Sequence, residues 1–469
     1  MIRIAKRDLR LSLIVYVPCL IQFFLFLLNS FSASDRVNYA MFIINYCIVL
    51  SIILCLVIKN WSDHFLAICF YSCFALFLMG QKPFKNEYDV FLTFNRVQLN
   101  TDQYYVFVSI LYLALFISYL SYDFLPVKSN SVSLQSISTN NALIKVLPLM
   151  KLVFIITLPA AFYMQLVVVI SKNSVSYTEG YLLNVNVPSI IKVGYYVYLM
   201  IVLLLLALKP RKLDLLIILS SYLFIEGGIQ LLQGRRALFA TTLLFIIWYT
   251  LKYYGIQYKD YKVFITSMIF LLGIVMLFFF VEQQRSGQSL SLSNNFISAF
   301  LISTGGSDSV IANTIYRGSE FPKPGIVYLL DPFVNNVLFN LLLGKHSAQG
   351  YSYLDEHNSF SHWISYLTEP SLYLSGHGMG SSYLAESYLA FGLLGVIIVS
   401  IGIGWLIKYI RTISFNDNAF RSALVFIFVQ SLFTLPRDGL FSWVGQLFYF
   451  AFMVILIYPF YYHYKKMES

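Results

Sequence analysis

The sequence predicts an all-α integral membrane protein, because apolar residues dominate, charges are scarce and long apolar runs recur along the chain. Hydrophobic residues make up 58% of the 469 residues, and charged residues make up 12%. Soluble domains carry about 25% charged residues. A helix that crosses a bilayer needs about 20 apolar residues, and we count about twelve such runs.

The predicted spans fall into nine before one long polar segment and three after it. The first nine are 11–29, 39–58, 64–80, 104–122, 146–170, 188–208, 213–232, 237–253 and 263–281. The last three are 386–408, 420–435 and 440–461. Because twelve is an even number, both termini are predicted to lie on the same side of the membrane.

Basic residues indicate which side holds the termini. Arg3, Lys6, Arg7 and Arg10 precede the first span, and later basic residues recur on the same predicted side. Cytoplasmic loops are enriched in Lys and Arg, so both termini are predicted to be cytoplasmic. The net charge of +10 is then explained by topology. It does not indicate a nucleic-acid partner, because no basic stretch outside the spans is interleaved with aromatic residues.

Three regions follow from this pattern. Residues 1–281 form an N-terminal transmembrane bundle, residues 282–385 a large outer loop, and residues 386–469 a C-terminal set of spans. The loop is expected to hold short helices on the membrane surface, including one over 325–343. If 325–343 crosses instead, every later assignment reverses; the basic residues between 408 and 421 argue against that alternative.

A glycine-rich cluster ends the outer loop and is the most specific feature. Gly378 and Gly380 permit close backbone approach, and Ser381 or Ser382 is expected to cap the following helix. The free amides of such a helix start suit a phosphate. Glu386 follows one turn later and is the leading candidate for a catalytic base. The alternative is that Glu386 only favours the helix dipole.

Four arginines are predicted to lie on this outer face, where arginine is normally disfavoured. They are Arg235, Arg236, Arg285 and Arg437. Planar guanidinium groups bind diphosphates in a bidentate manner, so the four are candidates for binding a substrate diphosphate. Two alternatives are open. The arginines bind lipid headgroups, or, for Arg437, the partner is the adjacent Asp438.

Two further titratable residues, Glu226 and His377, are candidates for a functional or a structural role. Glu226 lies inside the seventh span, and an intramembrane carboxylate predicts a functional role or an ion pair, here with an arginine of another span. His377 is a second candidate base or a surface residue.

His357 and His362 have a poor metal spacing, so no metal site is predicted. Nucleotide-binding motifs are absent from the sequence, and no cofactor is expected.

The C-terminal motif carries a family resemblance. Residues 378–388 read Gly-Met-Gly-Ser-Ser-Tyr-Leu-Ala-Glu-Ser-Tyr, followed by Phe391-Gly392 and Gly395. With the large outer loop and the predicted topology, this stretch resembles the C-terminal signature of the O-antigen polysaccharide polymerase (Wzy) family. The resemblance implies a membrane-embedded glycosyltransferase architecture like that of O-antigen ligases, and a metal-independent reaction.

The same resemblance implies a cellular location, a substrate and a reaction. The chain would lie in the bacterial inner membrane and join undecaprenyl-diphosphate-linked oligosaccharides on the periplasmic face, with a chain-length regulator as a further partner. Arg235, Arg236, Arg285 and Arg437 would stabilise the leaving diphosphate, and Glu386 or His377 would take the acceptor proton. A lipid-linked oligosaccharide flippase and an O-antigen ligase are the alternative functions.

Overall fold

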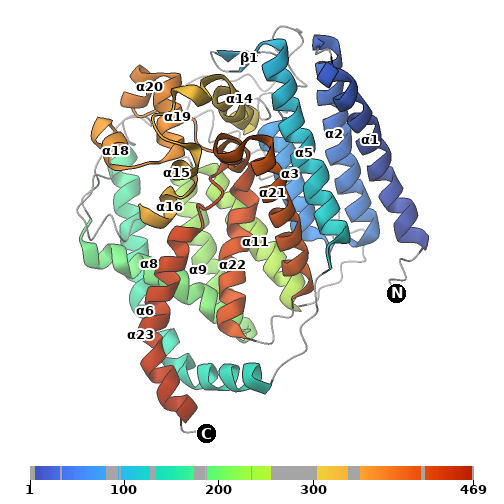
Figure 1. Cartoon of the computed structure of the whole chain (residues 1–469). Helices are drawn as coiled ribbons and strands as arrows, with labels where there is room; N and C mark the ends of the chain where they lie inside the picture. The colour runs from blue at the N-terminus through green and yellow to red at the C-terminus, as the bar shows by residue number, and fades with distance from the viewer. Residues whose placement is uncertain are drawn as a thin grey trace, which may run out of the picture.

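The structure, a computed structural model, describes residues 6–31, 34–80, 93–94, 97–126, 134–173, 185, 187–233, 235–254, 301, 304–335, 349–413 and 418–466. Nearly all of these residues are helical (Figure 1). The described part contains nine helices that are long and apolar enough to cross a membrane. The prediction of an all-α membrane protein is therefore confirmed in outline.

The predicted count of twelve spans is not confirmed. The nine candidate spans are Leu11–Ser30, Asp35–Asn60, Thr101–Phe124, Leu143–Ser171, Ser189–Ala207, Lys212–Leu232, Tyr383–Thr412, Ala419–Arg437 and Val444–His463. Two further predicted spans form helices that are not among the nine: α3 (Phe65–Leu78) and α11 (Arg236–Tyr254). The remaining predicted span, 263–281, lies outside the described residues.

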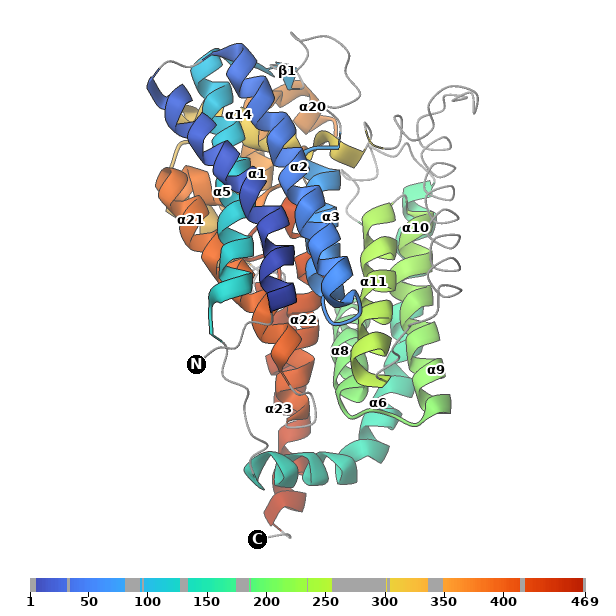
Figure 2. The same cartoon turned by 90° about the vertical axis from the view of Figure 1, so that its right-hand side faces the viewer.

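The helices form two groups. One group holds α1 (Lys6–Phe31), α2 (Asp35–Asn60), α3, α5 (Thr101–Phe124) and α21 (Tyr383–Thr412). The other holds α6 (Leu134–Asn173), α8 (Ser189–Ala207), α9 (Lys212–Tyr222), η2 (Leu223–Ile229), α10 (Gln230–Leu232) and α11. Helix α22 (Ala419–Thr434) contacts α3 of the first group and α8 and α11 of the second, so it joins them (Figure 2).

Close backbone contact fixes α21 against α5. A Cβ atom added at Gly404 of α21 would collide with the carbonyl oxygen of Ser118 in α5. Small residues at such crossings let two transmembrane helices pack closely without a hydrophobic driving force between them. Helix α21 therefore has a fixed position relative to the first group of helices.

The described part of the outer loop forms short helices at one end of the molecule. They are η3 (Gly305–Ser307), α14 (Asp308–Arg317), η4 (Gly318–Glu320), α15 (Gly325–Leu329), α16 (Asp331–Val334), α18 (Tyr351–Glu356), α19 (Phe360–Thr368) and α20 (Pro370–Leu374). The end of α23 (Val444–Lys466) lies at the opposite end, and α1 starts at the end of the first helix group that is away from β1 (Figure 1). The predicted surface helix over 325–343 is two short helices over 325–334, and residues 336–343 lie outside the described part.

Three local features depart from the predicted pattern of regular helices. Helix α21 is broken at Phe391 and Gly392, where Gly392 has φ +61°. The predicted seventh span contains the π-helical turn η2 around Glu226. A two-stranded antiparallel hairpin, β1 (Thr93–Phe94) and β2 (Val97–Gln98), lies before α5. Glycine breaks and π-helical turns both let a helix redirect side chains locally.

Candidate functional site

Glu386 lies in the short first segment of α21, before the break at Phe391, and its carboxylate is held at both oxygens. The Ser381 hydroxyl donates a hydrogen bond to Oε1 over 2.7 Å. The backbone N–H of Leu440 donates to Oε2 over 2.8 Å. The residue is only 8% exposed. This carboxylate therefore connects the glycine-rich loop to the turn that precedes α23.

The turn approaches Glu386 as closely as a glycine allows. It follows η5 (Leu435–Arg437) and spans residues 438–443. A Cβ atom added at Gly439 would lie 2.6 Å from Oε1 of Glu386, which is closer than ordinary contacts permit. Glycine at position 439 is therefore needed for the Leu440 amide to reach the carboxylate.

The glycine-rich loop packs against the same turn. Gly380 has φ +82°, a left-handed conformation that favours glycine, whereas Gly378 does not have a positive φ. A Cβ atom at Gly380 would lie 3.8 Å from the carbonyl oxygen of Arg437. The Met379 N–H donates to the Ser365 hydroxyl of α19 over 2.9 Å. Two clusters predicted to share one face are thus in contact.

The two serines do not act as predicted. Ser382 occupies the N-cap position of α21, but its side chain makes no capping hydrogen bond. Its hydroxyl is buried and has no hydrogen-bond partner in the described structure. Ser381 is buried too and uses its hydroxyl on Glu386. The capping prediction is therefore wrong for Ser382, and the hydroxyl of Ser381 binds the carboxylate instead.

Arg437 ends η5, and Asp438 begins the turn that packs against the glycine-rich loop. The Arg437 guanidinium is exposed and stands 5.3 Å from the centre of the Phe77 ring. Burial raises the pKa of the Asp438 carboxyl, while hydrogen bonds from Gly439 and Ser442 and the charge of Arg437 oppose that rise. The charge of Arg437 thus acts on Asp438, in the turn that contacts Glu386.

The other arginines are not brought to Glu386 in the part of the chain that is described. Arg235 follows α10, and its Nη1 donates to Oε1 of Gln230 over 3.5 Å. Arg236 begins α11. Arg285 lies outside the described residues. A shared diphosphate site for all four arginines therefore stays a prediction.

Glu226 was predicted to pair with an arginine of another span. The described residues show no such pair, and Arg285 lies outside them. Oε2 of Glu226 accepts a hydrogen bond from the Tyr195 hydroxyl of α8 over 3.2 Å, and the described structure contains no salt bridge to Glu226. The π-helical turn η2 positions this carboxylate between α8 and α11. The tyrosine hydroxyl satisfies one oxygen of the carboxylate without burying a second charge.

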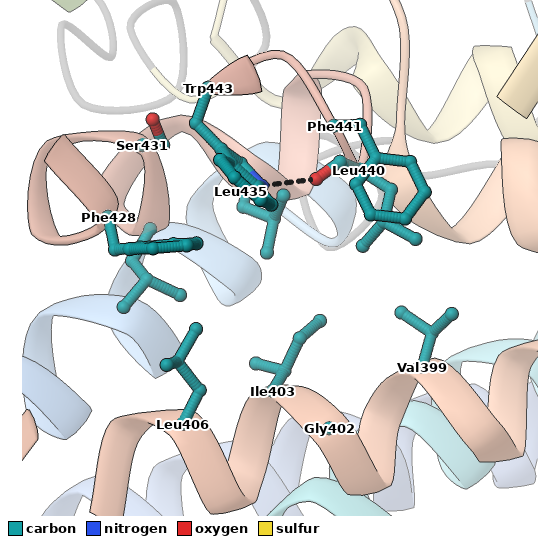
Figure 3. Close-up of a pocket in the computed structure, with 11 residues that line it drawn as sticks. Val399, Gly402, Ile403, Leu406, Phe428, Ser431, Leu435, Leu440, Phe441 and Trp443 are labelled. Carbon is teal, nitrogen blue, oxygen red and sulfur yellow. Dashed lines mark hydrogen bonds between the residues drawn. The ribbon is translucent and has the colours of Figure 1, made fainter. Parts of the chain in front are cut away.

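An apolar pocket of about 210 Å³ lies beside the Glu386 turn. Figure 3 shows Val399, Ile403 and Leu406 of α21 on one wall, facing the residues around the turn. The Leu440 side chain lines this pocket, and its carbonyl accepts a hydrogen bond from Trp443 Nε1 over 3.0 Å. Leu440 thus contacts the apolar pocket with its side chain and Glu386 with its amide.

The histidines lie apart from this carboxylate. His377 is exposed, and its Nδ1 lies 3.1 Å from the Ser375 hydroxyl; no hydrogen bond joins it to Glu386 in the described loop. Tyr353 stacks on both His357 and His362, with ring centres 4.1 Å apart in each pair. Residues 357 and 362 therefore contribute to the packing of the loop.

Sequence reasoning missed several groups that hold Glu386 and the glycine-rich loop in place. Leu440 contributes a backbone amide, which no side-chain pattern reveals. Ser365 lies in another helix of the loop, 14 residues before Met379. Gly439 follows the Arg437 and Asp438 that the sequence singled out, but nothing in the sequence indicates that a carboxylate lies against this glycine.

Comparison with known proteins identifies the family of the chain. No curated protein and no solved structure showed significant similarity to the chain. A family model, that of the O-antigen polysaccharide polymerase Wzy, matches residues 12–468. This match covers nearly the whole chain, including the candidate spans and the glycine-rich loop, and the chain therefore belongs to the O-antigen polysaccharide polymerase Wzy family.

Proposed function

We propose that this protein joins undecaprenyl-diphosphate-linked oligosaccharide repeat units into O-antigen, with release of undecaprenyl diphosphate. Membership of the polymerase family supports the general role. The observation that carries the specific proposal is the Glu386 site: a buried carboxylate held by Ser381 and Leu440, with Arg437 nearby and an apolar pocket behind the turn.

The proposed reaction is a glycosyl transfer without a metal ion. A hydroxyl oxygen of one lipid-linked unit attacks the anomeric carbon of the glycan on another, and the bond from that carbon to the diphosphate oxygen breaks. Undecaprenyl diphosphate leaves with the bonding electrons. Arg235, Arg236, Arg285 and Arg437 would stabilise its growing negative charge, where fixed positive groups contribute most.

Glu386 is proposed to take the proton of the attacking hydroxyl. Each carboxylate oxygen has two lone-pair sites, so Oε1 and Oε2 each keep one after accepting from Ser381 and Leu440. Because Ser381 Oγ lies 2.7 Å from Oε1, the proton has two routes, a direct one and one through this hydroxyl. His377 is the alternative base; its exposed position away from Glu386 makes it the second choice.

The apolar pocket is proposed to hold the first part of the polyprenyl chain. Its walls come from α21 and from the end of α22 with the following turn, so a chain lying there would place its diphosphate near Arg437. The short helices of the loop would then be periplasmic and both termini cytoplasmic, as the positive-inside bias predicts. A chain-length regulator would dock on the same outer side.

The lipopolysaccharide ladder of a strain lacking this gene tests the function. Loss of a polymerase should leave lipid A core that carries one repeat unit, and the wild-type gene should restore long chains. Loss of a ligase or of a flippase should leave core without any repeat unit. Core without repeat units in the deletion strain would therefore refute polymerisation.

A further inference from the structure

A second cavity, polar and about 170 Å³ in volume, lies within the bundle between α8, η2, α11, α22 and the start of α23. Its lining includes two carboxylates from segments far apart in the sequence, those of Glu226 and Asp438. Polar groups are costly inside a membrane bundle unless they are satisfied or functional. Packing alone therefore does not explain the polar groups of this cavity.

The lining chemistry excludes an anionic ligand. Hydroxyl and amide side chains complete the polar surface, among them Thr242, Gln446 and Ser442. No Lys, Arg or His contributes to the described lining. Because the two carboxylates lie in the described lining and no cation does, the wall of the cavity would repel a diphosphate. The same groups suit an uncharged molecule with several hydroxyls, which can donate to the carboxylates and accept from the hydroxyls and amides.

Two acceptors at the cavity lack partners within the described protein. Oε1 of Glu226 and Oε1 of Gln446 are buried and make no hydrogen bond. The Tyr195 hydroxyl reaches only Oε2 of Glu226. A buried acceptor that is left unpaired destabilises the folded protein. Both oxygens are therefore available for hydroxyl donors from a ligand.

We propose that this cavity binds one uncharged sugar residue of the lipid-linked repeat unit, an inference that rests on the proposed function. Its volume is below the roughly 300–1,000 Å³ of pockets for larger ligands, which suits a single ring. Tyr222 and Leu199 add apolar wall for the C–H faces of a sugar.

The position of the cavity suits this role in the proposed reaction. Asp438 lines the cavity, and Leu440, two residues further along, binds Glu386. Residues 438–440 would therefore separate a sugar held beside Asp438 from Glu386, the proposed base. The diphosphate would be bound separately, by arginine.

Kinetics on the full-length protein in lipid nanodiscs test the cavity. The probe is the lipid-linked repeat unit extracted from the strain that lacks this gene, and sugar-free undecaprenyl diphosphate serves as a competitor. Thr242→Val and Gln446→Leu each remove polar groups from the lining. We expect each to raise KM for the repeat unit about tenfold, the effect of losing one good hydrogen bond, with kcat and the inhibition constant of the competitor unchanged.

Thr250→Val is the matched control, because Thr250 lies on the same helix outside the cavity and donates to the Ile247 carbonyl. Unchanged KM in both cavity variants would overturn the proposal and leave a cavity that holds water only. An equal rise in KM and in the inhibition constant would overturn it too, because the lost contact would then not be to sugar.

Binding of the repeat unit, measured by thermal stabilisation of the protein, separates this inference from the proposed function. If wild-type protein binds the unit but does not polymerise it, the proposed function fails. In that case, weaker thermal stabilisation of Thr242→Val by the repeat unit would still support the sugar site. Unchanged stabilisation of Thr242→Val would refute it.

Discussion

The backbone N–H of Leu440 donates a hydrogen bond to Oε2 of Glu386 across 54 residues of sequence. This bond joins the first segment of α21 to the turn between η5 and α23. It makes the position of the carboxylate depend on the turn, and the turn also lines both the apolar pocket and the polar cavity. Changes in the turn should therefore act on Glu386 without altering it chemically.

Gly439→Ala is predicted to reduce polymerisation strongly while the protein still inserts. The added methyl group would lie 2.6 Å from Oε1 of Glu386, so the turn or the carboxylate must move. Overpacking of this kind costs about 1–3 kcal/mol. The measurement is the length of the lipopolysaccharide ladder at matched protein levels.

Gly445→Ala provides the control, because a Cβ atom there meets nothing within 4 Å. Its ladder should equal that of the wild type. Long chains from a normally expressed Gly439→Ala variant would show that the close approach of the turn to Glu386 is not required.

Substitution of Arg437 and Arg235 is predicted to abolish long chains. Alanine removes the guanidinium, and lysine should rescue poorly because it cannot bind a diphosphate in the bidentate manner. Ladders of Ala and Lys variants at both positions provide the test. Arg317→Ala is the control, since that side chain pairs with Glu320 in the outer loop over 3.0 Å. Full rescue by lysine at both positions would show that these residues only bind lipid headgroups or set the topology.

Much of the helical architecture followed from the long apolar runs of the sequence. Long apolar runs predicted helices such as Leu11–Ser30 and Val444–His463 close to their observed bounds. Helix α3 was predicted as a span over 64–80, but the observed helix is only 14 residues long and is not among the nine candidate spans. The π-helical turn at Glu226 could not be predicted either, since its neighbours read as an ordinary helix with two glycines.

The candidate site was predicted only as a set of segments on one face. Glycine and charge patterns marked Gly380, Glu386 and Arg437, and the structure brings the loop that carries Gly380 against Arg437. The sequence could not show that the carboxylate is bound by an amide of residue 440, because backbone donors are the same in every residue. It also could not show the shared cavity of Glu226 and Asp438, which depends on the packing of five segments.

Acid should destabilise the outer loop locally. Burial, helped by the charge of His357, lowers the pKa of His362 to about 4. An unfolded histidine has a pKa of about 6.5. The unfolded loop therefore binds more protons below pH 6.5, and local stability should fall by up to about 1.4 kcal/mol per pH unit towards pH 4.

Hydrogen exchange of residues 351–376 at several pH values measures this loss. His362→Phe keeps a ring against Tyr353 but cannot be protonated, so protection should become less dependent on pH. His377→Asn is the control, because His377 is exposed and should not affect the profile. Unchanged acid sensitivity in His362→Phe would mean that another group titrates.

Glu386→Gln distinguishes a catalytic carboxylate from a structural one. The glutamine carbonyl can still accept from the Leu440 amide, and its NH2 group can donate to the Ser381 hydroxyl, so both contacts survive with one reversed. The fold of the site should therefore persist. Only the capacity to take a proton is lost, and a general base contributes about 10²–10⁴-fold.

Under the catalytic hypothesis, Glu386→Gln should shorten the ladder to core with one repeat unit at wild-type protein levels. Glu320→Gln in the outer loop is the control for loss of one acidic charge, since Glu320 pairs only with the nearby Arg317 in the described structure. If Glu386 serves only to join α21 to the turn, Glu386→Gln should polymerise nearly as well as the wild type, because the hydrogen bonds are kept. A normal ladder would thus refute Glu386 as the base, and His377→Asn would then be tested for the same loss.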